Sequence, residues 1–218
     1  MSDQVADTNP ILDQFGRIDI YLFDQLMRGR ITSDMRVLDA GCGRGRNVEY
    51  LLKTGTDIYG VDRDPAQVEH VRELAKRAAP DVPPTHFEVA ELRSLPFPDQ
   101  HFDAVICNAV LHFSEDEVEF ESSVAELVRV LRVGGVLFTR LASTIGLETH
   151  VSHMRGRWYS LPDGSDRFLV DEAYLLQTTA AVGGTLLDPL KTTNVQNLRA
   201  MTTWVFRNDQ HQSMTPHP

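Results

Sequence analysis

The sequence is poor in the features that mark secreted, membrane and nucleic-acid-binding proteins. Its 218 residues include only two cysteines, Cys42 and Cys107, too few for a disulfide scaffold or a cysteine-only zinc site. No apolar run approaches the roughly 18 residues that span a bilayer, and the first residues are acidic where a signal peptide would be basic. Lys and Arg total 21 against 31 Asp and Glu, and the resulting charge of -10 repels phosphate backbones and anionic lipids. We therefore expect a cytoplasmic protein that binds neither nucleic acid nor membranes.

What the sequence does contain is enough apolar material for a single core. Hydrophobic residues make up 42% of the chain, and no internal repeat, low-complexity tract or flexible linker divides it. We expect a helical N-terminal cap over residues 1–34, one compact domain with it over residues 35–207, and a disordered polar tail over residues 208–218. Residues 1–8 are also expected to be frayed.

Strand and helix patterns alternate through the middle of the chain. Short apolar runs predict strands at residues 35–39, 57–62, 86–90, 102–107 and 136–141. Helical spacing predicts helices after Asn9-Pro10 (interrupted at Gly16), at 47–52, at 65–79, from a Ser114–Glu117 capping box to Gly134, and at 171–182. Residues 143–167 show no regular pattern, and a closing strand pair is expected at 185–195 and 199–207. This alternation predicts an α/β, doubly wound fold whose mostly parallel sheet has helices on both faces.

A glycine-rich turn follows the first predicted strand, where ligands of such sheets bind. Glycines at 41, 43 and 45 allow a ligand to approach the backbone closely. Asp62, about twenty residues further on, is placed to accept both hydroxyl hydrogens of a ribose. A dinucleotide fingerprint would require glycine where Arg46 stands, and Asp39 would repel a diphosphate, so nicotinamide dinucleotides are not expected. The turn therefore indicates a different nucleoside-containing ligand.

Four ordered blocks resemble the class I S-adenosylmethionine-dependent methyltransferases. They are Val37–Asn47 with Asp62, Ala90–Asp99, Phe102–Cys107 and Leu131–Val136. The Gly-Arg-Asn end of the turn is similar to the tellurite-resistance branch, and Leu-Pro-Phe-Pro-Asp to the small-molecule (type 11) branch. The resemblance implies a Rossmann-like, seven-stranded sheet of order 3-2-1-4-5-7-6. It also implies that S-adenosylmethionine is bound, that S-adenosylhomocysteine is released, and that a small molecule accepts the methyl group by direct in-line transfer.

The resemblance also implies roles for single residues. Asp39 and the turn residues Gly41, Gly43 and Gly45 would hold the methionine part, and Cys42 and Asn47 complete this group. Asp62 would bind the ribose, Arg63 would pack beside the adenine, and Leu92 would contact the ring through its backbone amide. Glu91, where Asp is more frequent in the family, would accept from the adenine amino group, and Asn108 would meet the methionine end.

Candidates for the acceptor side are concentrated after the fifth predicted strand. Residues 144–167 include His153, Arg155, Arg157 and Tyr159, an aromatic and cationic group in an acidic protein. We interpret this segment as part of a pocket for an anionic or aromatic acceptor, with a surface excursion or a subunit contact as the alternative. Arg17 and Tyr21 of the N-terminal helix would cap the same pocket.

His112 follows the fourth predicted strand and has two interpretations. It would serve as a general base if the acceptor carries a proton, or it would simply pack in the core. No metal is expected, because His150 and His153 lack a third ligand nearby in the sequence. The two cysteines are expected to be small buried residues, and the acidic run 114–121 a solvated helix face.

Two other functions remain as alternatives. The chain could bind S-adenosylmethionine without catalysis, as a sensor or an assembly partner. Aminopropyl transfer from the decarboxylated cofactor is less favoured, since a polyamine needs an acidic pocket and the predicted one contains Arg and His. We expect a monomer or a homodimer.

Overall fold

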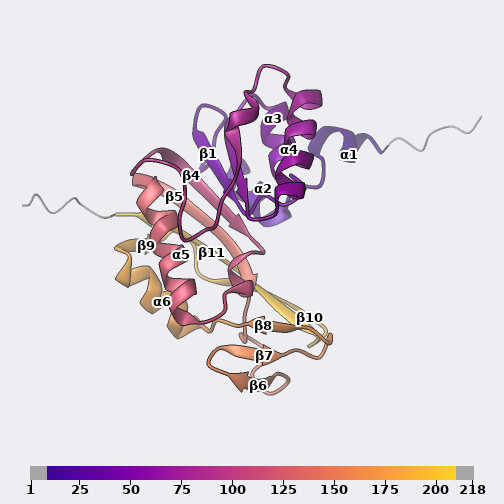
Figure 1. Cartoon of the computed structure of the whole chain (residues 1–218). Helices are drawn as coiled ribbons and strands as arrows, with labels where there is room; N and C mark the ends of the chain where they lie inside the picture. Colours follow the sequence, from indigo (N-terminus) through magenta and orange to yellow (C-terminus); the bar gives the residue numbers. More distant parts are fainter. Residues whose placement is uncertain (1–8, 210–218) are drawn as a thin grey trace, which may run out of the picture.

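The computed structural model describes residues 9–209, and the predictions for residues 1–8 and 210–218 lie outside this range. A large mixed sheet forms the centre, with helices on both faces and a small second sheet at one end (Figure 1). The strands of the large sheet are β1 (Arg36–Ala40), β2 (Asp57–Asp62), β3 (Phe87–Val89), β4 (Phe102–Asn108), β5 (Leu131–Ala142), β9 (Gly184–Leu186), β10 (Lys191–Val195) and β11 (Arg199–Asn208). Among the described residues, no helix is long and apolar enough to cross a membrane.

The strand order agrees with the predicted one. It is β10-β11-β5-β4-β1-β2-β3, parallel from β3 to β5, with β11 antiparallel to β5. The sheet has eight strands rather than seven because the sixth is split into β9 and β10, which both pair with β11. Pro189 lies in the gap between them and has no backbone N–H to offer the ladder. The predicted end of the last strand is one residue short, since Asn208 belongs to β11 and its amide donates to the carbonyl oxygen of Leu131 at 2.9 Å.

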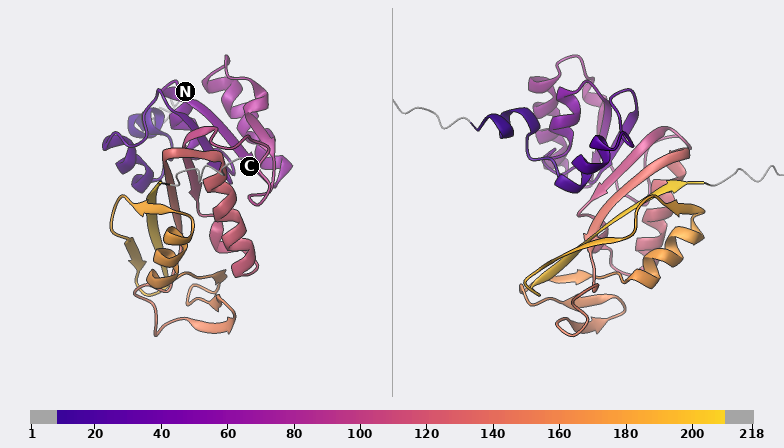
Figure 2. Two further views of the ribbon diagram at one scale, coloured as in Figure 1. Left: turned by 90° about the vertical axis from the view of Figure 1, so that its left-hand side faces the viewer. Right: turned by 180° about the vertical axis from the view of Figure 1, so that it is seen from behind.

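Helices cover both faces of the sheet (Figures 1 and 2). They are α1 (Pro10–Phe15), α2 (Ile20–Met27), α3 (Val48–Lys53), α4 (Pro65–Ala78), α5 (Glu117–Val130) and α6 (Glu172–Ala181), with short 3-10 turns η1 (Pro84–His86) and η2 (Leu111–Phe113). Leu22, Val48 and Val68 bring α2, α3 and α4 into one core cluster. Phe120 and Leu175 bring α5 and α6 into the cluster on the other face. The expected break at Gly16, whose φ is +63°, separates α1 from α2.

The start of α5 differs from the predicted capping box. Asp116, not Ser114, is the N-cap, and its carboxylate accepts from the N–H of Glu119 at 2.8 Å. The Ser114 hydroxyl instead donates to the carbonyl oxygen of Leu111 at 2.9 Å, which closes the preceding turn η2. The helix ends at Val130 rather than at Gly134, because Leu131 already pairs with Phe102 as the first residue of β5.

Residues 143–167 are more regular than predicted. They contribute most of a three-stranded antiparallel sheet of β6 (Ser152–Arg155), β7 (Trp158–Ser160) and β8 (Asp166–Phe168). This small sheet packs through Leu161 and Leu169 against Ala142 at the end of β5. Figure 2 shows the β10–β11 hairpin extending toward it. The segment is therefore an extension of the carboxyl edge of the large sheet.

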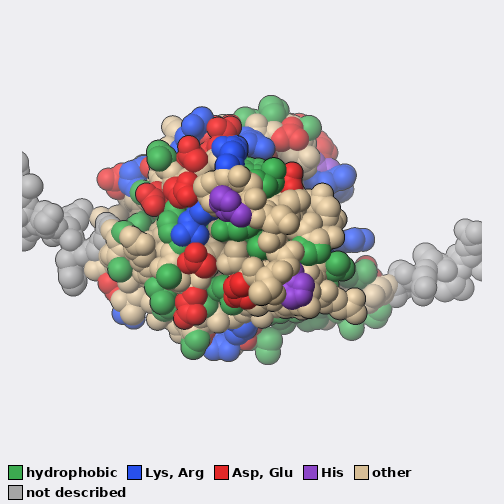
Figure 3. Space-filling model, turned by 90° about the horizontal axis from the view of Figure 1, so that it is seen from below, with side chains coloured by type: hydrophobic (Ala, Val, Ile, Leu, Met, Phe, Trp, Pro, Cys, Tyr) green, Lys and Arg blue, Asp and Glu red, His purple; other side chains and the backbone are tan. Residues whose placement is uncertain are grey.

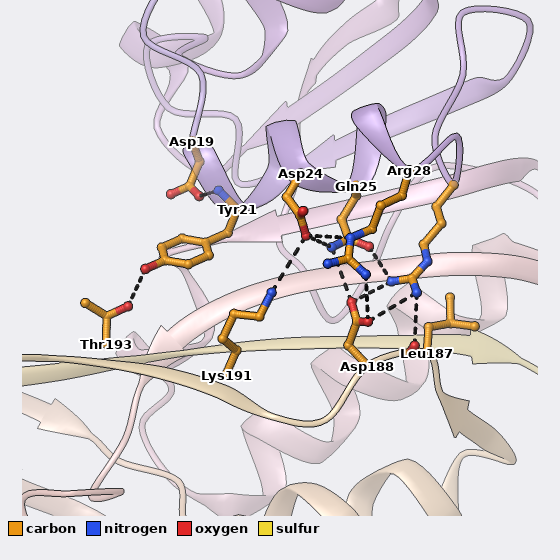
Figure 4. Close-up of polar contacts among 10 residues, drawn as sticks. Asp19, Tyr21, Asp24, Gln25, Arg28, Leu187, Asp188, Lys191 and Thr193 are labelled. Carbon is orange, nitrogen blue, oxygen red and sulfur yellow. Dashed lines mark hydrogen bonds and ion pairs between the residues drawn. The ribbon is translucent and has the colours of Figure 1, made fainter.

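A polar cluster attaches α2 to the β9–β10 side of the sheet (Figure 4). Asp188, between β9 and β10, contacts Arg30 at 2.5 Å and Arg28 at 3.3 Å. The hydrogen bond from Arg30 lowers the pKa of Asp188, so this carboxylate stays ionised. Two further contacts lie along the same helix: Asp24 with Lys191, and Tyr21 with Thr193. These contacts hold α2 across the carboxyl end of the sheet.

Candidate functional site

A cavity of about 450 Å³ lies at the carboxyl ends of the parallel strands. Its wall includes every predicted cofactor-binding residue except Asp39 and Gly45, namely Gly41, Cys42, Gly43, Asn47, Asp62, Arg63, Glu91, Leu92 and Asn108. Other residues on the wall are Arg44, Arg46, Ala90, Arg93, Ala109, Val110, Leu111, Phe113, Ser114, Glu119 and Ser123. The fold thus brings together strand ends that are far apart in the sequence.

The glycine turn is held against β2 by its own backbone. The N–H groups of Gly41 and Cys42 both donate to the carbonyl oxygen of Val61, at 2.8 and 2.9 Å. Gly43 has a φ of +51°, and a Cβ added there would meet nothing within 4 Å, so a ligand can lie close to this backbone. The Cys42 side chain is buried, which raises the pKa of its thiol and makes it a poor nucleophile.

Gly45 has a different role from the other turn glycines. Its φ is +79°, and a Cβ there would lie 2.7 Å from Cδ2 of Leu74 in α4. It lies outside the cavity wall. The absence of a side chain at this position therefore allows the turn to pack against α4.

Asp62 is fixed at the end of β2 by two backbone donors. Its Oδ2 accepts from the N–H of Gly43 at 2.9 Å, and its Oδ1 accepts from the N–H of Asp64 at 3.0 Å. A carboxylate oxygen has two lone pairs, so each oxygen retains one for a ligand hydroxyl. The geometry suits a ribose with two adjacent hydroxyls.

Asp39 and Asn108 are the buried polar groups of the site whose side-chain atoms have no hydrogen-bond partner in the protein. Asp39 is 1% exposed, and neither of its carboxylate oxygens has a hydrogen-bond partner. Burial raises the pKa of Asp39 to about 7, with Arg46 opposing the shift. Asn108 is 7% exposed and both polar atoms of its side chain also lack partners. Because buried polar groups are normally paired, these two fit a ligand carrying an ammonium group and other polar atoms.

The remaining predicted cofactor residues form the outer parts of the wall. Arg63 and Glu91 are exposed, and Leu92 is half-buried. The Oδ1 of Asn47 accepts from the N–H of Asp19 at 3.1 Å, which ties the turn to the start of α2.

The sequence did not predict that Glu119 and Ser123 lie on the cavity wall, because residues 114–121 were interpreted only as a solvated helix face. Their position on the first turns of a helix that starts near a strand end was the available signal.

His112 lies behind the cavity wall rather than on it. It is 6% exposed, and its Nδ1 accepts from the N–H of Ala142 at 3.3 Å. Burial, with Arg167 and Arg140 nearby, lowers the pKa of His112 to about 4, so the ring is neutral at neutral pH. The geometry favours packing over a general-base role.

The acceptor residues predicted from the irregular segment lie on the small sheet, outside the cavity wall. Arg157 contacts Asp171 at 2.9 Å and lies 3.8 Å from the ring centroid of Tyr174. Arg155 lies over the ring of Trp158, and the Nε2 of His153 is hydrogen-bonded to the carbonyl oxygen of Gly156. Tyr159 packs edge-on against His153. These side chains thus have protein partners already.

The small sheet reaches the cavity at two other points. Trp158 donates from its indole nitrogen to the carbonyl oxygens of Ser114 and Glu115, at 3.1 and 2.9 Å. Arg167 lies 5.0 Å from the ring centroid of Phe113, which is on the wall. Seen from this end, the surface mixes charged, polar and small hydrophobic groups (Figure 3). The small sheet therefore supports the rim of the cavity.

The two N-terminal acceptor candidates also lie off the wall. Arg17 is exposed, between α1 and α2. Tyr21 lies on α2, with the guanidinium of Arg140 5.0 Å from its ring centroid. Among residues 9–209, no group of three His, Cys, Asp or Glu is arranged to hold a metal ion.

Comparison with known proteins identifies the domain that carries this cavity. Residues 38–139 match the type 11 methyltransferase family model, described as a methyltransferase domain. Malonyl-[acyl-carrier protein] O-methyltransferase of Halorhodospira halophila is 34% identical over 131 residues, 59% of this chain and 40% of that protein. Fatty-acid O-methyltransferase of Mycolicibacterium smegmatis is 30% identical over 125 residues, 56% of this chain and 43% of that protein. The chain thus spans about two fifths of the length of these relatives.

A solved structure shows the same fold over nearly the whole chain. A SAM-dependent methyltransferase from Methanosarcina mazei superposes with a TM-score of 0.70 at 18% identity, covering 85% of this chain and 98% of that one. The sheet order, the glycine turn and the family match agree with one another. Residues 38–139 are therefore a methyltransferase domain of the class I S-adenosylmethionine-dependent family.

Proposed function

We propose that the chain is an S-adenosylmethionine-dependent methyltransferase that acts on a small-molecule acceptor. The observation that carries this proposal is the pair of buried, unpartnered groups Asp39 and Asn108 beside the cavity of a methyltransferase domain. An ammonium group of the cofactor's methionine part would satisfy Asp39, and the ribose hydroxyls would satisfy Asp62. Arg63, Glu91 and Leu92 would surround the adenine.

Bound S-adenosylmethionine would supply a methyl group that is already activated by a positively charged sulfur. The protein's own task is then to align the acceptor in line with that group and to exclude water. No covalent intermediate is needed, and the buried Cys42 thiol is unsuited to forming one. The relatives named as O-methyltransferases favour an oxygen atom as the acceptor.

Calorimetric titration with S-adenosylhomocysteine tests the cofactor assignment. We expect binding, and we expect Asp62→Ala to weaken it by about 1–3 kcal/mol, because the ribose hydroxyls lose a charged acceptor. Asp81→Ala, which changes an exposed aspartate outside the cavity, is the matched control. Equal affinity of the Asp62 variant and the wild type would refute the assignment of Asp62 to the ribose. Tighter binding of NADH than of S-adenosylhomocysteine would refute the proposed methyltransferase function.

Turnover separates catalysis from simple binding. Labelled S-adenosylmethionine and a metabolite extract should yield a product one methyl group heavier, detected by untargeted mass spectrometry. Tight binding of S-adenosylhomocysteine without any methylated compound would instead support the noncatalytic alternative.

A further inference from the structure

Buried polar groups without protein partners form a row on one face of the large sheet. On this face, apolar residues of four adjacent strands belong to the core beneath α2: Val37, Ile106, Phe138 and Val205. Two positions further toward the cavity edge, the same strands carry four polar residues: Asp39, Asn108, Arg140 and Thr203. Each has at least one buried side-chain atom without a hydrogen-bond partner, and within residues 9–209 no other residue does.

The register of the strands makes this row continuous from Asn108 to Thr203, whereas Asp39 lies next to Ile106, two residues before Asn108. Asn108 of β4 lies next to Arg140 of β5, and Arg140 lies next to Thr203 of β11. Asn108 is on the cavity wall, so the row leads away from the cavity toward β11. Thr203 is 5% exposed, whereas the side chain of Arg140 keeps 19% of its surface accessible. Arg140 is therefore the point of this pair that solvent reaches, and neither Arg140 nor Thr203 is on the described cavity wall.

The charged groups above the row are two arginines and one aspartate, and Arg46 also acts on the Asp39 carboxylate within the row. Arg140 and Arg46 approach the same oxygen of Asp19, with N–O distances of 3.3 and 3.5 Å. Two guanidinium groups thus share one carboxylate. The Nε of Arg140 is buried and has no acceptor. Because an unpaired buried donor on a cation is costly, this geometry fits an anionic ligand.

We propose, building on the methyltransferase function above, that this row is the acceptor subsite and that the acceptor is a carboxylic acid bound as its carboxylate by Arg140 and Thr203. Arg140 would donate from its guanidinium, and Thr203 would donate from its hydroxyl. The ring of Tyr21, beside Arg140, would contact the body of the acceptor.

The chemistry of the wall also favours a carboxylate. An alcohol, amine or thiol must lose a proton when it is methylated; the described wall contains no imidazole or amine that could take it, and its possible bases are the carboxylates of Asp62, Glu91 and Glu119. A carboxylate is already deprotonated at neutral pH. Its oxygen lone pair forms the new C–O bond, the electron pair of the broken C–S bond stays on sulfur, and the products are a methyl ester and S-adenosylhomocysteine. No proton is released.

Binding of octanoate to the 218-residue chain, saturated with S-adenosylhomocysteine, tests the subsite. Octanamide has the same chain without the charge, and octyl phosphate tests whether the site prefers a phosphate group to a carboxylate. We expect octanoate to bind at least tenfold more tightly than either in calorimetry. Mass spectrometry should then detect methyl octanoate when S-adenosylmethionine replaces the product.

Variants locate the site. Arg140→Gln should weaken octanoate binding tenfold or more and leave the affinities for octanamide and S-adenosylhomocysteine within twofold. Thr203→Val should weaken octanoate binding several-fold while raising the Tm, because it removes an unpartnered buried hydroxyl. Arg132→Gln, at the far end of β5, and Thr139→Val, whose hydroxyl donates to the carbonyl oxygen of Trp204, are the matched controls.

Several outcomes would overturn the proposal. They are octanoate binding no tighter than octanamide, tighter binding of octyl phosphate that Arg140→Gln abolishes, or wild-type octanoate affinity in both row variants. If Arg140→Gln also loses S-adenosylhomocysteine, Thr203→Val alone decides the question. Failure of the wild type to bind S-adenosylhomocysteine would refute the proposed function instead of the acceptor class.

Discussion

Replacing Asp39 by Asn should make the protein more stable at alkaline pH and a weaker binder of its cofactor. The carboxylate is buried, its oxygens have no partners, and burial raises its pKa to about 7. Asparagine has nearly the same shape but cannot ionise. The substitution therefore removes a charge that folding leaves uncompensated.

The magnitude and sign follow from the two pKa values of Asp39. In the unfolded chain its pKa is about 3.9. Between about pH 4 and pH 7 the folded state keeps a proton that the unfolded state has lost, so stability falls as pH rises through this window. A difference of about 3 units at 1.36 kcal/mol each amounts to roughly 4 kcal/mol above pH 7. Asp39→Asn should recover part of this, and its advantage should vanish near pH 4.

Urea unfolding of both proteins at pH 4.5 and pH 8 measures the effect as a difference from wild type. Asp103→Asn is the control with the opposite sign. Burial pushes the pKa of Asp103 up, but hydrogen bonds from Arg36 and Arg132 outweigh it and lower the pKa. Losing that carboxylate should therefore destabilise the protein at pH 8. An Asp39→Asn variant no more stable than wild type at pH 8, or with unchanged S-adenosylhomocysteine affinity, would refute the reasoning.

Three further predictions concern other parts of the fold. His112→Asn should reduce the loss of stability as the pH falls from 6.5 to 4, which is roughly 3 kcal/mol in the wild type. The reason is that the folded-state pKa of about 4 keeps the ring neutral over this range, while the unfolded chain takes up a proton. If the free energy of unfolding in urea had the same pH dependence in the variant and the wild type, this would be contradicted. Gly45→Ala should lower the free energy of unfolding by about 1–3 kcal/mol and leave cofactor affinity unchanged, whereas Gly43→Ala should mainly reduce cofactor affinity. Calorimetric titration measures both affinities, and a loss of affinity in the Gly45 variant alone would contradict this. Asp188→Ala should lower the free energy of unfolding by about 1 kcal/mol and speed proteolytic cleavage within the segment that precedes Arg30. An unchanged rate of cleavage would contradict this.

The parallel core could be predicted because its local signals and its burial agree. Strand β2 matches its predicted bounds, since a buried apolar run ends in the aspartate that the site uses. The small sheet could not be predicted. Its strands are only three or four residues long, and β6 is exposed along its whole length, so no periodicity marks it. Its position depends on contacts such as Trp158 with Ser114, which are 44 residues apart.

The two halves of the site differ in the same way. The proposed cofactor residues stand at strand ends, and a rule about strand ends finds Asp62 and Asn108 from the sequence alone. Arg140 and Thr203 stand inside strands that became neighbours only through the antiparallel return of β11. The sequence predicted an anionic acceptor near Arg155 and Arg157, whereas the subsite proposed above is at Arg140 and Thr203; the structure places Arg155 on β6 and Arg157 in the turn that follows, both outside the cavity wall.

The ionic attachment of α2 makes the N-terminal segment responsive to salt. Its contacts with β10 and the β9–β10 connection are largely between charged side chains that water can reach, such as Asp24 with Lys191. At 0.15 M salt such interactions are screened over roughly 8 Å, whereas the apolar core is not weakened by screening. Rising ionic strength should therefore weaken the ionic contacts of α2 with the β9–β10 side of the sheet, while the buried side chain of Leu22 still holds the helix in the apolar core.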